Sequence, residues 1–139
     1  MFLIITGFTL LVSCGDDDDD NDDDAPVELV TRSIIGTWDA WEDGFSCKDK
    51  WVYNADNTFT CNSNQEIWTG TYVFETETEV GSDPKLTVFI ETDNVLVDCH
   101  DGVIDESENQ FTVLVEFEND SVATWSAAGL SNPKNFVKR

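Results

Sequence analysis

The strongest constraint on the fold of this chain is a set of short segments in which apolar and polar residues alternate. In the clearest of them, apolar residues occupy every second position: Trp68, Gly70, Tyr72 and Phe74; Leu86, Val88 and Ile90; and Phe111, Val113, Val115 and Phe117. Successive side chains of a β-strand point to opposite faces of a sheet, so this period of two predicts strands with one buried face. The intervening positions carry Thr and Glu more often than not. The sequence therefore predicts an amphipathic β-sheet.

Strand-like segments recur along the whole body of the chain. We expect strands at residues 35–42, 50–53, 58–61, 67–75, 86–91, 95–99, 111–118, 121–125 and 135–139. Turn-forming residues separate several of them, at residues 54–57, 81–84, 93–94 and 119–120. Short strands joined by tight turns favour an up-and-down antiparallel sheet, and closure into a barrel removes its exposed edges. The predicted fold class is all-β, an antiparallel barrel of about eight to nine strands.

Acidic residues dominate the charge of the chain. Of its 29 Asp and Glu residues, eight lie between Asp16 and Asp24, which leaves 21 acids against seven bases, or −14, for the rest. Such a surface would be repelled by the phosphates of nucleic acid and by anionic lipid headgroups. We therefore expect no nucleic-acid partner, and a membrane location needs a covalent anchor. With 139 residues, the chain has room for one folded domain.

The N-terminal residues are typical of a secretory signal peptide that ends just before a cysteine. Residues 1–12 are apolar apart from two Thr and one Gly; this run is too short to span a bilayer, which takes about 20 residues. It ends in Leu-Val-Ser-Cys-Gly at residues 11–15, which resembles the lipobox of bacterial lipoproteins. The resemblance implies that residues 1–13 are removed and that Cys14 is diacylated and holds the protein to a membrane. An uncleaved or simply secreted form, and a core role for Cys14, are the alternatives. No Lys or Arg precedes the run, which leaves open whether the true start codon lies upstream.

An acidic run follows the cysteine directly. Residues 16–24 are eight Asp and one Asn. Like charges with nothing apolar to bury cannot fold, so we expect residues 14–28 to form a solvated tether. The position of the run resembles the export signal of surface lipoproteins in Bacteroidota, which implies an outer-membrane protein facing the cell exterior. A plain spacer, or a loose binder of divalent ions, is the alternative interpretation.

Two motifs in the predicted barrel domain, residues 29–139, resemble the lipocalin family. Ile-Gly-Thr-Trp at residues 35–38 is similar to the G-x-W signature, and residues 53–59 are similar to the F-x-x-D-G-T-F hairpin of bacterial lipocalin-like lipoproteins. The resemblance implies a calycin barrel in which Gly36 and Trp38 form the floor, with Trp38 beneath a basic side chain, Arg139 or Lys138, of the last strand. Asn57 stands where the hairpin has glycine, and Asn also adopts the left-handed conformation. A different small barrel or sandwich is the alternative.

Three cysteines remain for a disulfide, and an odd number leaves one unpaired. In a simple meander the strands alternate in direction, which places Cys47 and Cys61 at one end of the barrel and Cys99 at the other. We therefore expect a Cys47–Cys61 disulfide, although the hairpin register strains it by placing Cys61 nearer Trp51. A Cys61–Cys99 bond is the next alternative. Cys99 alone would be a small buried residue.

The sequence contains no recognisable catalytic or metal-binding constellation. His100 is the only histidine, and it lies between Cys99 and Asp101. Adjacent strand residues face opposite ways, so Cys99 and His100 cannot act as nucleophile and base. A zinc site would require Cys61, Cys99 and His100 to converge on one point. We expect a solvated His100, acidic solvated loops at residues 75–79 and 105–108, and neither enzyme activity, metal nor cofactor.

The predicted barrel suggests a binding function. An eight-stranded barrel can hold one small apolar or amphipathic ligand. The candidate ligand-binding residues are the inward-facing Trp51, Tyr53, Phe59, Trp68, Tyr72, Phe111 and Val113. The alternative is a packed barrel without an internal ligand, which binds a protein, glycan or cation through its acidic loops. An internal cavity would favour the first function, and an interior filled by these side chains the second.

Overall fold

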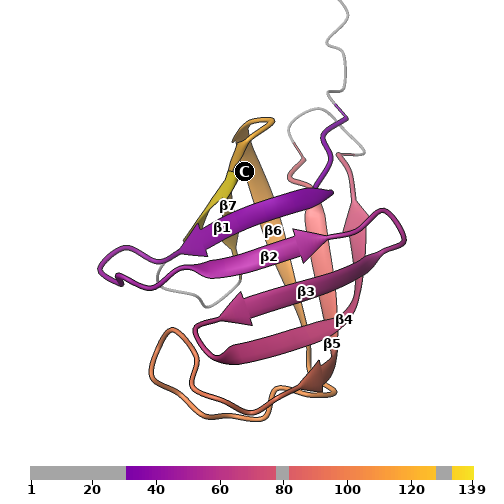
Figure 1. The fold of residues 1–139 in the computed structure, drawn as a ribbon. Coiled ribbons are helices and arrows are strands. Elements are labelled where there is room, and N and C mark those ends of the chain that lie inside the picture. The colour runs from indigo at the N-terminus through magenta and orange to yellow at the C-terminus, as the bar shows by residue number, and fades with distance from the viewer. Residues whose placement is uncertain (1–30, 78–81, 128–132) are drawn as a thin grey trace, which may run out of the picture.

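The computed structural model describes residues 31–77, 82–127 and 133–139 (Figure 1). The predicted signal peptide at residues 1–13, Cys14 and the tether at residues 14–28 lie outside the described residues.

Eight antiparallel strands form a closed barrel in chain order (Figure 1). They are β1 (Gly36–Trp41), β2 (Asp49–Tyr53), β3 (Thr58–Ser63), β4 (Glu66–Glu75), β5 (Lys85–Asp93), β6 (Gln110–Asn119), β7 (Val122–Ser126) and β8 (Lys134–Lys138). Each strand pairs with the next, and β8 pairs with β1 to close the barrel, with Trp38 opposite Lys138. The predicted all-β, up-and-down barrel is confirmed.

The strand predicted at residues 95–99, the sixth of the nine expected, is wrong. These residues belong to a long connection between β5 and β6 that runs from residue 94 to residue 109, named here the 94–109 loop. Val95 has a φ of 54°, and its N–H donates to the Asp93 carboxylate at 2.8 Å. The Asp98 carboxylate accepts the N–H groups of His100 and Gly102 at 2.8 and 2.6 Å. Local side-chain bonds of this kind compete with a strand ladder, and here they replace it.

The period of two places the apolar faces of the strands inside the barrel. The fully buried side chains include Trp38, Trp51, Tyr53, Phe59, Leu86, Val88, Val115 and Phe136. Phe136 of β8 stacks on Trp125 of β7, with ring centroids 3.8 Å apart. The core is therefore one hydrophobic cluster, to which most of the strands contribute aromatic rings.

One end of the barrel, named here the floor, is closed by Trp38. Its indole N–H donates to the Ile34 carbonyl at 2.7 Å, and the Lys138 ammonium lies 5.4 Å from its ring centroid. Gly36 has a φ of 134°, and a Cβ there would lie 2.6 Å from Cε of Lys138, so glycine makes room for the lysine stem. Lys138 is thus the basic partner of Trp38. The expectation for Arg139 is wrong, because its guanidinium pairs with Asp39 at 2.8 Å.

The disulfide joins Cys47 to Cys99, so the predicted Cys47–Cys61 bond is wrong. With residues 95–99 outside the sheet, the β1–β2 and β5–β6 connections both lie at the end of the barrel opposite the floor, and the two cysteines meet there. We call this the disulfide end. Cys61, which lies opposite Trp51 and Trp68 on the neighbouring strands, is buried in the core as a free thiol. Cys99 is therefore not the unpaired cysteine.

Candidate functional site

The seven predicted ligand-binding residues come together inside the barrel, and they pack against one another. Trp51 lies at the centre of the group, with its ring centroid 5.6 Å from that of Phe59, 5.9 Å from those of Tyr53 and Trp68, and 6.4 Å from that of Phe111. Tyr72 contacts Tyr53 at 5.0 Å, and Val113 belongs to the same buried cluster. These side chains form the core of the barrel.

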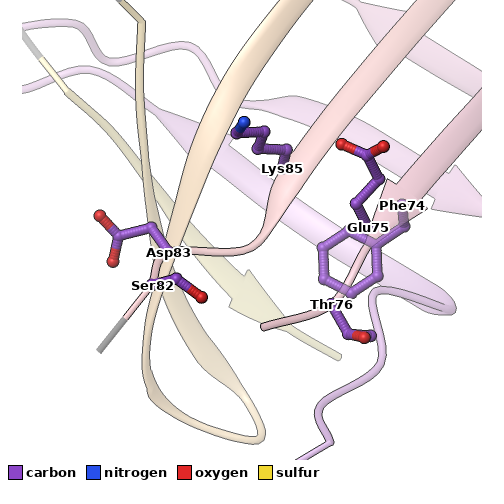
Figure 2. A pocket seen from close by; sticks show the side chains of 6 residues that line it. All are labelled: Phe74, Glu75, Thr76, Ser82, Asp83 and Lys85. Atoms are coloured by element: carbon purple, nitrogen blue, oxygen red, sulfur yellow. The ribbon is translucent and has the colours of Figure 1, made fainter. Parts of the chain in front are cut away.

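Two hollows that the structure describes lie on the surface. One, of about 460 Å³, lies at the β4–β5 connection and is lined by Phe74, Glu75, Thr76, Ser82, Asp83 and Lys85 (Figure 2). Its charged groups stand apart and do not converge on one point (Figure 2). The other, of about 400 Å³, lies at the disulfide end between residues 44–47, Asn64 and residues 98–101. None of the seven predicted residues lines either hollow.

The disulfide end is covered by the 94–109 loop, which is fastened to the β3–β4 turn. The Gln65 N–H donates to the Val97 carbonyl and the Cys99 N–H to the Ser63 hydroxyl, each at 3.0 Å. The Asn94 side chain accepts from the Ile67 N–H at 2.9 Å and donates to the Gln65 carbonyl at 3.0 Å. With the disulfide to Cys47, these bonds tie the first half of the loop to two neighbouring connections.

The 94–109 loop exposes aliphatic side chains to solvent. Val95, Leu96, Val103 and Ile104 are 38–63% exposed, and Ile67 at the start of β4 borders them at 41%. The same loop contains five acids: Asp98, Asp101, Asp105, Glu106 and Glu108. The 94–109 loop thus combines exposed aliphatic and acidic residues.

Two buried carboxyl groups lie on strands that begin at the disulfide end. Asp49 at the start of β2 is 5% exposed and pairs with Lys134 at 3.1 Å, but its Oδ1 has no partner. Glu66 at the start of β4 is 2% exposed, and its Oε2 also has no partner. Burial and the neighbouring charge of Asp93 raise the pKa of Glu66 from 4.5 to about 7. The nearby Trp68 indole lowers this pKa in part, although its N–H falls short of a hydrogen bond.

Further polar atoms in the interior are also without partners. They are the indole nitrogens of Trp51, Trp68 and Trp125 and the hydroxyl of Tyr53. A buried donor that lacks an acceptor costs about 1–3 kcal/mol, so such atoms normally find a water or a ligand. The pKa of Tyr53 is raised well above 10, first by burial and then by the neighbouring Cys61 and Tyr72.

His100 lies on the 94–109 loop and is partly exposed. Its Nε2 is 3.6 Å from the Glu42 carboxylate, and its ring contacts Phe45 with centroids 4.6 Å apart. Over residues 31–77, 82–127 and 133–139, no group of three or more His, Cys, Asp or Glu side chains is arranged to hold a metal ion. The same residues include no helix long and apolar enough to cross a membrane.

Sequence reasoning missed the buried carboxyl groups and the loop above them. The signal for the carboxyl groups was present, because Asp49 and Glu66 lie two residues before the inward-facing Trp51 and Trp68. The loop was not predicted because the apolar residues 95–97 are typical of a strand.

Comparison with known protein families, curated proteins and solved structures finds no match to this chain.

Proposed function

We propose that this protein is a lipid-anchored binding module of the bacterial cell surface, in which a packed, lipocalin-like barrel presents the disulfide end to a partner protein. One observation carries the proposal. The side chains expected to line a ligand cavity pack against one another in the core, while four exposed aliphatic residues lie on a loop that a disulfide holds in place. The seven core residues then act as a scaffold.

The direction of the chain supports this arrangement. The described residues begin at the floor, and β1 runs from there toward the connection that contains Cys47, so the 94–109 loop lies at the far end (Figure 1). An anchor at Cys14, followed by the acidic tether that the sequence predicts, would hold the floor toward the membrane. The disulfide end would then face outward.

The chemistry of this end indicates the kind of partner. Val95, Leu96, Val103 and Ile104 offer an apolar surface, and the five acids of the loop surround it with negative charge. A matching partner surface combines Lys or Arg with aliphatic side chains, because charge complementarity speeds encounter and apolar contact supplies affinity. Raised salt should slow this association.

Photo-crosslinking on intact host cells tests the proposal. A photoreactive residue at Ile104 should yield a discrete protein adduct, and one at Val73, an aliphatic position on the barrel wall that is also at least half exposed, should not. The adduct should disappear when Val103 is replaced by Asp. Equal adducts at both positions, or none at Ile104, would contradict a binding face at the disulfide end.

A second function, an amphipathic ligand inside the barrel, is favoured by the unpartnered interior atoms. Three indole N–H groups and the Tyr53 hydroxyl offer donors, and Asp49 and Glu66 offer acceptors. Native mass spectrometry of protein purified from its own host tests this function. A bound small molecule that is lost when Trp51 and Trp68 are replaced by Phe would support it, and a mass equal to that of the lipidated chain alone would oppose it.

A further inference from the structure

The closed position of the 94–109 loop is built around one buried acid. Glu66, the first residue of β4, lies among the residues that hold the loop, since Ser63, Gln65 and Ile67 make the bonds described above. Its side chain is 2% exposed, and Oε2 accepts no hydrogen bond. The loop therefore lies over a carboxyl group that its surroundings do not satisfy.

The groups that face Glu66 are mostly acids. Asp93 at the end of β5, and Asp98 and Glu106 on the loop, each disfavour its ionised form. On its own strand, the Trp68 indole lowers the pKa of Glu66, more weakly than burial and Asp93 raise it but more strongly than Asp98 or Glu106 alone does.

The remaining neighbours do not supply a cation to Glu66. On β3, burial raises the pKa of the Cys61 thiol most. Asp49 of β2 and Glu66 also raise it, and Lys134 of β8 lowers it. The Lys134 ammonium pairs with Asp49 and Glu42. Among the described residues no Lys, Arg or His forms an ion pair with Glu66.

We propose that Glu66 is a proton-controlled latch for the 94–109 loop. When Glu66 is protonated, it stays buried and the loop lies closed on the β3–β4 turn. When it loses its proton to solvent, its charge repels Asp93, Asp98 and Glu106, and residues 94–98 swing away while the disulfide keeps Cys99 attached to Cys47. The exposed aliphatic residues Val95 and Leu96 would then change position, and a consequence for partner binding rests on the proposed function.

The direction of the pH dependence follows from burial. The closed loop raises the pKa of Glu66 to about 7, whereas an open loop returns it toward 4.5. The closed form therefore binds the proton more tightly. Closure is complete below pH 4.5 and weakens as the pH rises through about 7. Acid conditions close the latch, and alkaline conditions open it.

Amide hydrogen exchange on the full-length, lipidated protein in detergent tests the latch. The reporters are the N–H groups of Gln65 and Cys99, which close the loop on the turn. After correction for the intrinsic effect of pH, their protection should fall by about tenfold or more between about pH 5.5 and about pH 8. The N–H groups of β6 should show no such change. Equal protection of Gln65 and Cys99 at both pH values would overturn the proposal.

Variants identify the group that titrates. Glu66→Gln should keep the loop closed at both pH values, whereas Glu116→Gln, an exposed carboxyl on β6, should behave like the unmodified protein. Glu106→Gln should shift the opening to lower pH because it removes a like charge. Histidine also changes charge between about pH 5 and 8, so His100→Asn serves as a further control and should leave the opening in place. Opening that persists in Glu66→Gln, or that disappears in His100→Asn, would overturn the assignment to Glu66.

The unmodified protein alone gives a decisive result if Glu66→Gln fails to fold. Hydrogen exchange measures loop opening without any partner. If the loop opens with pH as expected but crosslinking finds no binding face, the proposed function is refuted and the latch is supported.

Discussion

Removal of the Cys47–Cys99 disulfide should cost this barrel a large part of its stability. The two cysteines are 52 residues apart in sequence, and the bond joins the β1–β2 connection to the 94–109 loop. In the chain-entropy account, a closed loop of this length stabilises the folded state by about 4 kcal/mol. Single domains are stable by only about 5–15 kcal/mol, so the loss should be plain.

Urea unfolding of a Cys47→Ser, Cys99→Ser double variant measures this effect. The measurement is made in a Cys14→Ser background, which removes the cysteine outside the described residues. Tryptophan fluorescence should report a fall in unfolding free energy of about 4 kcal/mol. Cys61→Ala is the matched control, since Cys61 is a free buried thiol and its replacement should cost only about 1 kcal/mol. A double variant as stable as its parent would refute the stabilising role of the disulfide.

Peptide mapping tests the pairing itself. The Lys and Arg positions divide the chain so that Cys47, Cys61 and Cys99 fall in three tryptic peptides, residues 33–48, 51–85 and 86–134. Without reductant, residues 33–48 should be linked to residues 86–134. A link between residues 33–48 and 51–85 would restore the sequence-based pairing and remove the brace from the 94–109 loop.

Four further outcomes follow from the structure. Phe136→Ala should lower the unfolding free energy by about 3–5 kcal/mol in urea titrations, because the ring is fully buried and stacked in the core. Gly36→Ala should cost about 1–3 kcal/mol in the same assay, because a Cβ would meet Lys138 at a positive φ; a neutral effect would contradict the described floor. The raised pKa of Glu66 should make stability fall as the pH rises from 4.5 to about 7, by no more than about 3 kcal/mol, and Glu66→Gln should flatten this dependence. Cys14→Ala should release the protein from membranes and abolish lipid labelling, and a variant that stays bound would refute the proposed anchor.

The strands of the barrel could be predicted because a period of two is a local property of the sequence. Leu86, Val88 and Ile90 alternate in the sequence, and all three are buried in the structure. Whether the inward side chains leave an empty space cannot be judged from a local pattern, because it depends on how rings from different strands pack together. Trp51 contacts rings on four other strands, including Trp125 on β7 at 5.2 Å, and no pattern within β2 contains that information.

The partner of Trp38 illustrates a similar limit. The family resemblance implied a basic residue from the last strand, and both Lys138 and Arg139 met that description. The choice follows from register, since Lys138 lies directly opposite Trp38 in the β1–β8 pair and Arg139 is one residue beyond, where the side chain faces the other way. Register between the first and last strands depends on closure of the whole barrel, which a local pattern does not report.

The two largest departures from the sequence-based expectation concern the same place in the molecule. Residues 95–99 form a loop where a strand was expected, and Glu66, for which no role was predicted, is buried beside that loop. Buried carboxyl groups without partners lower stability, and proteins tend to retain such costs where they serve a function. The disulfide fixes the middle of the 94–109 loop by a covalent bond, whereas the closure of its first half depends on the protonation of one side chain. A loop held in these two ways can change shape locally without loosening the barrel, which is the property expected of a regulated binding face.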